Sequence, residues 1–218
     1  MHRLMEVYQR LLGHFGPQGW WPAETPFEVI VGALLTQQTA WRNVERAIEN
    51  LKGAGLMDAH ALARADLDDI AETIAPCGFY RTKPLRLKRM ASYIYDNYGD
   101  VESFLERPAA ELREELLSLD GIGPETADSI LCYASDKLIF VVDAYTKRIG
   151  RRLGLFDSEK YDDVRFHFQR IVPKDLKTYR EFHALMVQLG KNYCRGSPMC
   201  GPCPLGDMCE HARESDGD

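Results

Sequence analysis

The chain has 218 residues, of which 45% are hydrophobic and 10% aromatic, so it can bury a sizeable core in one domain or in two small ones. No stretch approaches the ~20 apolar residues of a membrane span, and no secretory signal begins the chain, which predicts a cytoplasmic protein without membrane contact. Six cysteines in such a reducing compartment favour thiols or metal ligands over disulfides.

The net charge of −6, from 27 Lys and Arg against 33 Asp and Glu, argues by itself against a nucleic-acid partner. Its distribution changes that expectation, because basic residues gather in two runs. The first run is Arg81, Lys83, Arg86, Lys88 and Arg89, and the second is Lys137, Lys147, Arg148, Arg151 and Arg152. Such runs are usually solvated helix faces, but these two flank a glycine hairpin and therefore favour DNA.

Hydrophobic periodicity predicts helices along the whole chain. The first is amphipathic, over residues 2–15, and an irregular Trp-Trp-Pro segment follows it at residues 20–22. A wholly apolar stretch over 27–35 indicates a buried helix, and Thr39 can cap the helix after it. The apolar run 138–142 has no partner strand and is interpreted as a buried connection, so the predicted fold class is all-α. Further helices are predicted over 58–64, 66–74, 84–98, 101–105, 108–117, 144–153, 158–171 and 177–190.

A tight Gly-x-Gly hairpin is predicted between two of these helices, at residues 118–126. Pro124 suits the first position of the second helix, because the N–H that proline lacks would have no intrahelical partner. Gly121 and Gly123 allow positive φ and leave backbone amides uncovered. Amides at a helix N-terminus bind phosphate, so the hairpin is a predicted phosphate-binding element.

The C-terminal region has a cysteine-rich loop of the pattern C-x5-C-x2-C-x5-C. Four thiols so close together in a reducing compartment indicate a metal site, either an iron–sulfur cluster or zinc. Cys77 and Cys132 lie in apolar settings far from this loop and are predicted to be buried packing residues. The predicted metal ligands are Cys194, Cys200, Cys203 and Cys209.

Three features in this order resemble the endonuclease III-like helix-hairpin-helix (HhH-GPD) DNA glycosylases over nearly the whole chain: the Leu-Asp-Gly-Ile-Gly hairpin at residues 119–123, Asp143 some twenty residues later, and the four-cysteine loop. The resemblance implies two helical domains with a DNA-binding groove between them. One is a six-helix domain over 26–135 that contains the hairpin, and the other combines 1–25 with 136–218. It also implies a [4Fe–4S] cluster on the four cysteines, although the first gap in their pattern is one residue shorter here than is usual in the family.

Within the family, the Trp-Trp-Pro segment, the Thr-Gln-x-Thr segment and the Gly-Pro-Glu-Thr-Ala-Asp of the hairpin are similar to 3-methyladenine DNA glycosylase III. Known members of that branch can lack the cluster. The usual role of a tryptophan is core packing, but an aromatic face also attracts a cationic alkylated purine by ~0.5–2 kcal/mol. The residues that the resemblance implies for the base pocket are Trp20, Trp21, Pro22, Trp41 and Glu125.

Asp143 is the predicted catalytic carboxylate, because glycosidic cleavage builds positive charge on the sugar and needs a group that takes a proton from water. Its residue type would also suit a simple helix N-cap. Bifunctional family members carry a lysine in the hairpin that forms a Schiff base, and Glu125 occupies that position here. The sequence therefore predicts a monofunctional DNA N-glycosylase without lyase activity, with Lys147 as a phosphate contact rather than a substitute amine.

Resemblance also supplies the predicted DNA contacts, with Gln37 filling the gap that the extruded nucleotide leaves and Phe79 acting as an apolar wedge. The alternatives are a hydrogen bond that closes the turn for Gln37 and a core contact for Phe79. The predicted partner is double-stranded DNA that contains damaged bases, bound at the nucleoid by a monomer. The predicted DNA-binding residues are Gln37, Phe79, Arg81, Leu119, Gly121, Gly123, Lys147, Lys191 and Arg195.

Three other functions remain open at this point. One is an endonuclease III-type glycosylase and AP lyase acting on oxidised pyrimidines, against which the missing hairpin lysine counts. Another is a mismatch-specific thymine or uracil glycosylase. The last is a DNA-binding module without catalysis whose cluster is structural or redox-sensing. The main hypothesis remains a glycosylase that flips an alkylated purine such as 3-methyladenine out of the duplex and hydrolyses its N-glycosidic bond through Asp143 and water.

Overall fold

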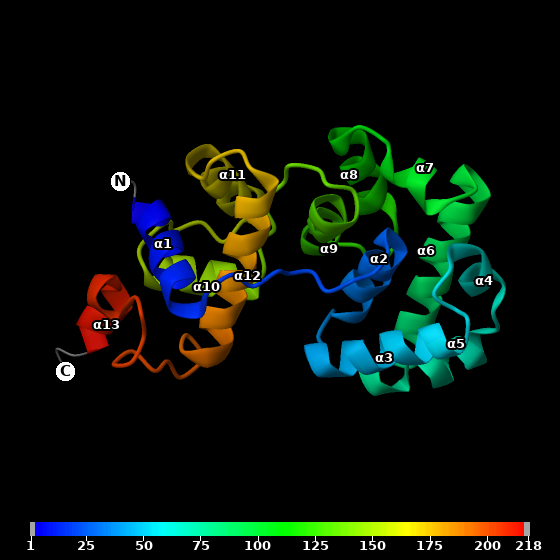
Figure 1. The fold of residues 1–218 in the computed structure, drawn as a ribbon, viewed down its shortest axis with the longest axis horizontal. Coiled ribbons are helices and arrows are strands. Elements are labelled where there is room, and N and C mark those ends of the chain that lie inside the picture. Colours follow the sequence, from blue (N-terminus) through cyan, green and yellow to red (C-terminus); the bar gives the residue numbers. More distant parts are fainter. Residues whose placement is uncertain (1–2, 216–218) are drawn as a thin grey trace. The chain divides into compact units, whose positions relative to one another are not determined.

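The computed structural model describes residues 3–215, which form thirteen α-helices and no strand (Figure 1). The predicted all-α class is therefore confirmed. None of the described helices is long and apolar enough to span a bilayer. The helices are α1 (Arg3–Phe15), α2 (Pro26–Leu35), α3 (Trp41–Gly53), α4 (Ala59–Arg64), α5 (Leu67–Thr73), α6 (Thr82–Tyr98), α7 (Val101–Leu105), α8 (Ala109–Ser118), α9 (Pro124–Ser129), α10 (Ala144–Arg152), α11 (Tyr161–Ile171), α12 (Leu176–Asn192) and α13 (Glu210–Ser215). Short 3-10 turns at Ala75–Cys77 and Gly206–Met208 and a π-helix at Ile130–Ala134 complete the secondary structure.

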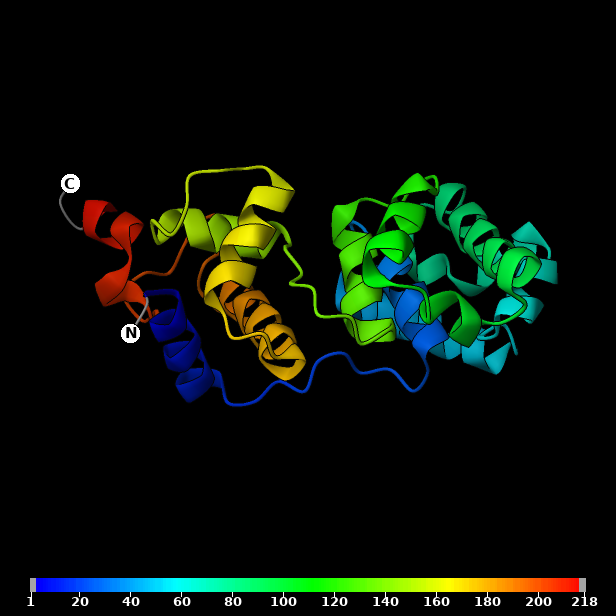
Figure 2. The same cartoon turned by 90° about the horizontal axis from the view of Figure 1, so that it is seen from above.

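The chain packs into two compact units, which Figure 2 shows from a second direction. The hairpin unit is the continuous stretch Ala23–Lys137 and contains α2 to α9. The discontinuous unit combines Met1–Pro22 with Leu138–Asp218 and contains α1 and α10 to α13.

The hairpin unit is built around α2. Residues 27–35 of this helix are all buried, and it packs against α3, α6, α9 and the π-helix. Its start is well defined, because Pro26 occupies the first turn and the side chain of Thr25 accepts a hydrogen bond from the backbone N–H of Glu28. An apolar helix that is buried on every side has no amphipathic stripe, which is why its sequence is almost uninterrupted by polar residues.

The discontinuous unit joins both ends of the chain in one core. Leu4, Val7 and Leu11 of α1 are fully buried, and α1 packs against α11 and α12. Phe140 stacks on Phe168 with 4.3 Å between the ring centroids. Since the first helix buries its apolar face only against helices near the other terminus, this unit has to be discontinuous in sequence.

Local details differ from the sequence predictions at three places. Ala40, not Thr39, is the N-cap residue of α3, because the Thr39 hydroxyl lies 3.1 Å from the carbonyl oxygen of Cys77 and donates there. Gly121 has φ of 83° as expected, but Gly123 has φ of −92°, which any residue adopts. The helix after the hairpin ends at Ser129 and continues as a π-helix.

Candidate active site and DNA-binding elements

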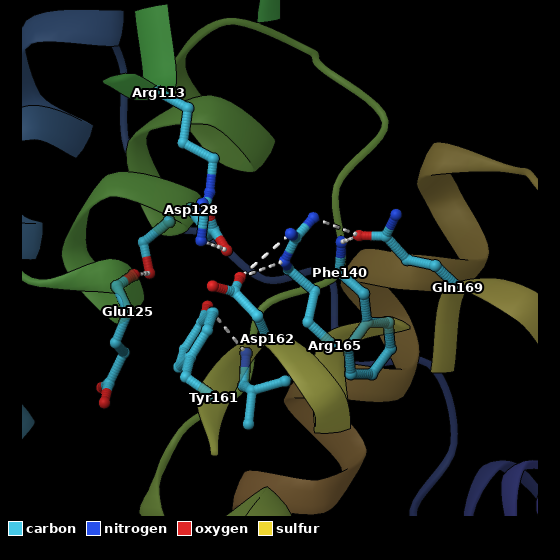
Figure 3. Close-up of polar contacts among 10 residues, drawn as sticks. Arg113, Glu125, Asp128, Phe140, Tyr161, Asp162, Arg165 and Gln169 are labelled. Carbon is cyan, nitrogen blue, oxygen red and sulfur yellow. Dashed lines mark hydrogen bonds and ion pairs between the residues drawn. The ribbon is translucent and has the colours of Figure 1, made fainter. Parts of the chain in front are cut away.

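The hairpin lies between α8 and α9, where the sequence predicts it. A Cβ atom on Gly121 would lie 2.2 Å from Nε of Arg86, so the Arg86 side chain would have to move, and the positive φ of Gly121 independently favours glycine. Arg113 of α8 binds Asp128 of α9, with 2.6 Å between Nε and Oδ1, as Figure 3 shows. The Asp128 side chain has no exposed surface, so a buried ion pair fixes the two helices of the hairpin relative to each other.

The side chain of Gln37 braces the hairpin. Its Nε2 donates to the carbonyl oxygen of Gly121 and to Oγ1 of Thr126, both at 3.0 Å, and its Oε1 accepts from Nη1 of Arg86 at 2.7 Å. The predicted turn-closing hydrogen bond is thus replaced by a long-range one. Insertion of this side chain into DNA would require exchange of these three hydrogen bonds for contacts with bases.

Phe79 stands at the tip of the loop that precedes α6. Its φ of 51° is in the left-handed region, and 51% of its surface is exposed, so the alternative of a core contact is wrong. Its neighbour Tyr80 is 67% exposed, and the Arg81 guanidinium lies 5.6 Å from the Tyr80 ring centroid. Two exposed aromatic rings beside an exposed cation form a surface that suits unstacked bases and phosphates.

Asp143 is the N-cap residue of α10 and is only 8% exposed. Its Oδ1 accepts hydrogen bonds from the backbone N–H and the hydroxyl of Thr146, at 2.7 and 2.8 Å. Its Oδ2 lies 3.8 Å from Nε2 of His183. Burial lowers the pKa of His183 more than the Asp143 carboxylate raises it, so the imidazole is neutral at neutral pH. Asp143 is thus both a cap and a firmly oriented carboxylate.

The connection that leads to Asp143 is held by α11. The backbone N–H of Phe140 donates to Oε1 of Gln169 at 3.2 Å, and that of Val142 donates to the Tyr161 hydroxyl at 3.3 Å (Figure 3). Residues 139–142 are buried as predicted, whereas Leu138, the first residue of the predicted run, is 43% exposed. The side chains of Gln169 and Tyr161 satisfy backbone donors that a strand would have paired. The contacts fix the backbone immediately before the carboxylate.

The residues implied for the base pocket are distributed over both units. Trp20 and Trp21 lie in the discontinuous unit, with 5.2 Å between their ring centroids, and Pro22 ends that segment. Trp41 begins α3 in the hairpin unit and donates its Nε1–H to Glu45 at 2.7 Å. All three tryptophans are half-buried rather than part of the cores.

Glu125 is exposed in the first turn of α9, which is a favourable place for a carboxylate. Its backbone carbonyl accepts a hydrogen bond from the hydroxyl of Ser129 at 2.7 Å.

The first basic run is largely bound inside the hairpin unit. Lys83 is 3% exposed, and Nζ of Lys88 donates to the carbonyl oxygen of Ala65 at 2.6 Å. Arg89 pairs with Asp120 of the hairpin at 3.0 Å. Contacts distant in sequence therefore bind these cations, so this run is not simply the solvated helix face that such runs usually form.

Two arginines of the second basic run, Arg148 and Arg152, bind the cysteine loop. Arg148 donates through Nε to the carbonyl oxygen of Cys194 at 2.9 Å. Arg152 donates to the carbonyl oxygens of Arg195 and Gly196 at 2.6 and 3.0 Å, and its Nη1 lies 3.3 Å from Sγ of Cys194. Sequence reasoning missed both roles, and the i, i+4 spacing of these arginines is the signal that places them on one face of α10.

The remaining predicted phosphate contacts lie in the discontinuous unit. Nζ of Lys147 is 5.7 Å from the Tyr161 ring centroid, and its side chain is half-buried. Lys191 and Arg195 are exposed beside the cysteine loop, where Nε of Arg195 donates to the Lys191 carbonyl oxygen at 2.7 Å. These cations are positioned to attract an anionic partner.

The four cysteines of the loop line one cavity of about 20 Å³. Within residues 3–215 no three His, Cys, Asp or Glu side chains meet closely enough to hold a metal ion. Burial raises the pKa of the Cys203 thiol, and the neighbouring cysteines raise it further. Cys77 and Cys132 are buried elsewhere, as predicted. The predicted ligands, Cys194, Cys200, Cys203 and Cys209, lie around this one cavity, but the structure does not bring three of them within metal-binding distance of one another.

A glycine hairpin that joins two helices, together with an oriented carboxylate at the start of another helix, defines an all-α protein of the helix-hairpin-helix DNA glycosylase class. The family described as HhH-GPD superfamily base excision DNA repair protein matches residues 31–174. The chain belongs to this superfamily.

Relatives and solved structures agree with this assignment. A protein of Methanocaldococcus jannaschii that is named as a DNA repair glycosylase is 47% identical over 209 residues, which cover 94% of this chain and 95% of that protein. The structure of H. pylori 3-methyladenine DNA glycosylase bound to 1,N6-ethenoadenine is 32% identical with a TM-score of 0.78, over 86% of this chain and 97% of the other. A non-covalent endonuclease III–DNA complex has a TM-score of 0.84 at 22% identity, over 100% of both chains, and shows a common fold.

Proposed function

We propose that this protein is a monofunctional DNA glycosylase that excises alkylated purines such as 3-methyladenine from double-stranded DNA. The observation that carries the proposal is that the chain has both an oriented carboxylate, Asp143, and a carboxylate, Glu125, at the hairpin position where a lyase needs an amine. Membership of the superfamily supports the glycosylase reaction, and the reading of these two residues supports its monofunctional form.

In the proposed reaction, the C1′–N bond of the extruded nucleotide breaks and the base leaves with the bonding electrons. A water molecule adds to C1′, and Asp143 accepts the proton that this water loses. Thr146 holds Oδ1 with two hydrogen bonds, which leaves Oδ2 to face the developing positive charge and the water. The product is an abasic site, because an attack by water forms no imine.

The proposed substrate class rests on the tryptophans. An N-alkylated purine is cationic, so it is a good leaving group and it stacks on an electron-rich ring with ~0.5–2 kcal/mol of extra attraction. Trp20, Trp21 and Trp41 are half-buried and lie outside the buried cores. The 32% identity with a 3-methyladenine DNA glycosylase supports the same class.

The proposed DNA contacts come from loops and helix ends. Phe79 would act as the wedge, Gln37 would fill the gap after release from its brace, and backbone amides of the hairpin would bind a phosphate. Further phosphate contacts are proposed for Arg81, Lys147, Lys191 and Arg195, with Leu119, Gly121 and Gly123 forming the hairpin surface.

We further infer that Cys194, Cys200, Cys203 and Cys209 hold a [4Fe–4S] cluster. Their positions around one cavity support this inference, and so does Arg152, whose cation next to Cys194 would offset the negative charge of thiolate ligands. Such a cluster would supply a rigid covalent tie for the loop that carries Arg195. We expect the purified protein to be brown, with visible absorption and stoichiometric iron and sulfide that a Cys203→Ser variant loses. A colourless protein that contains zinc would contradict the cluster.

One experiment tests the reaction and the substrate together. Duplexes that carry 3-methyladenine, thymine glycol, uracil or hypoxanthine are incubated with the protein, and strands are separated with and without alkali. We expect release of 3-methyladenine and strand nicking only after alkali. Nicking without alkali, or a covalent protein–DNA adduct after borohydride reduction, would contradict the monofunctional form. Preferential release of thymine glycol or uracil would move the assignment to an endonuclease III-type or a mismatch-type enzyme.

A further inference from the structure

Lys83 is a buried cation that the proposed reaction does not use. It lies in the first turn of α6, with 3% of its surface exposed. Nζ donates to the carbonyl oxygen of Leu35 at 2.8 Å, to that of Cys77 at 3.3 Å, and to the hydroxyl of Thr39. An ammonium group has three N–H donors, so these three acceptors satisfy it fully.

The acceptors belong to two loops that are far apart in sequence. Leu35 ends α2 and Thr39 precedes α3, so both frame the loop that carries Gln37. Cys77 ends the 3-10 turn before the loop that carries Phe79. Two of the three acceptors are carbonyl oxygens at the ends of helical segments, where partial negative charge favours a cation. A direct hydrogen bond from the Thr39 hydroxyl to the Cys77 carbonyl oxygen, at 3.1 Å, joins the same loops.

Each of the two loops also contains a residue with a positive φ, a backbone conformation that residues other than glycine rarely adopt. Gln38 has φ of 53° and Phe79 has φ of 51°. Left-handed backbone of this kind is energetically unfavourable for these residue types and persists only where surrounding contacts hold it. The two residues lie next to, or at, the side chains that are proposed to enter the DNA.

We propose that Lys83 is a positioning residue for base extrusion, which fixes the distance between the loop that carries Gln37 and the loop that carries Phe79. This inference rests on the proposed function, because it assumes that the two side chains act together on one nucleotide. Burial lowers the pKa of Lys83, because a buried ammonium group loses its contact with water. The two loops need the three hydrogen bonds of this group rather than its charge.

The test compares Lys83→Met with Lys88→Met. Lys88 lies on the same helix and donates to a single backbone carbonyl, that of Ala65, away from both loops. The same substitution therefore removes the same kind of hydrogen bond without touching the loops. Three quantities are measured for each variant: amide hydrogen exchange in residues 36–40 and 77–80, affinity for undamaged duplex, and the single-turnover rate of 3-methyladenine release well below the melting temperature.

For Lys83→Met we expect faster exchange in both loops and a release rate lower by about 10- to 100-fold, since a displacement near 1 Å can cost this much. Its affinity for undamaged duplex should stay near that of the wild type, and Lys88→Met should match the wild type in all three. A Thr39→Val variant, which keeps the lysine, should show the same pattern more weakly. It provides the test if Lys83→Met does not fold.

The results that would overturn the role of Lys83 differ from those that would overturn the proposed function. An active wild type with an equally fast Lys83→Met, or equal losses of release rate and of affinity for undamaged duplex, would overturn the role of Lys83 alone. A wild-type protein that releases no base from any duplex would overturn the proposed function as well.

Discussion

Asp143→Asn should lower the single-turnover rate of base release by about 100- to 10,000-fold, which is the usual contribution of a positioned general base. The amide is neutral, so it neither stabilises positive charge on the sugar nor accepts the proton of water. Binding of damaged duplex should be retained, because the backbone and phosphate contacts proposed here lie elsewhere. The measurement is release of radiolabelled 3-methyladenine from duplex DNA under enzyme excess.

The same variant should stay folded. Asparagine caps a helix about as well as aspartate, so the free energy of unfolding should change by less than about 1 kcal/mol. Asp175 offers a matched control, because it caps α12 in the same way, accepting from the backbone N–H and the hydroxyl of Thr178 at 2.8 and 2.6 Å. Asp175→Asn should leave the release rate unchanged. If Asp143→Asn released base at the wild-type rate, Asp143 would be a cap only, and another group would have to accept the proton of the water. If the wild type released no base from any duplex, a non-catalytic DNA-binding module would become the better hypothesis.

The helical fold was predictable because its pattern is local. The amphipathic spacing of α1 and the wholly apolar run of α2 each appear within about a dozen residues. The cap at Asp143 and the first-turn proline Pro124 follow from residue type and position. Thr39 shows the limit of this reasoning. Its residue type suits a cap, but Cys77, 38 positions later, takes its hydroxyl. Local preference loses when a distant partner offers a better hydrogen bond.

Charged residues show the same limit more strongly. A sequence gives the sign and spacing of the basic runs but not which carbonyl oxygens their side chains reach. Lys83 is buried among backbone carbonyls, and Arg152 holds a loop more than forty positions away. Both belong to the basic runs whose distribution favoured a DNA partner. Net charge and runs of charge predict the electrostatic field at the surface only when the charged side chains that bind other groups of the protein are left out.

The candidate site was predictable only in part for the same reason. Asp143 and the cysteine loop were recognisable from order and spacing along the chain. The brace formed by Gln37, which joins residues 84 positions apart through the Gly121 carbonyl, was not. A side chain with a role on DNA in relatives has a separate set of partners in this protein without DNA, and no sequence pattern reports such alternative partners.

Arg113→Met should give the largest loss of stability, about 3–5 kcal/mol in the free energy of unfolding, because it leaves a fully buried carboxylate without this cation. Asp128 accepts two hydrogen bonds from the guanidinium, at 2.6 and 3.3 Å, so both geometry and charge are lost together. Urea unfolding of the wild type and the variant measures the effect. Arg89→Met is the matched control, since Arg89 pairs with Asp120 of the same hairpin but both side chains are more than half exposed, and it should cost less than about 1 kcal/mol.

A double variant separates the charge from the packing. Replacing Arg113 by methionine and Asp128 by leucine together removes both charges and should recover most of the stability, because a buried ion pair and a well-packed apolar pair are often nearly equivalent. Affinity for undamaged duplex then becomes the informative measurement. If the pair serves only to avoid a buried charge, the double variant binds DNA like the wild type. If the bidentate geometry sets the angle between α8 and α9, the double variant is stable and yet binds DNA more weakly, because the hairpin amides no longer meet a phosphate. A double variant as unstable as Arg113→Met would instead show that other contacts of Asp128 dominate.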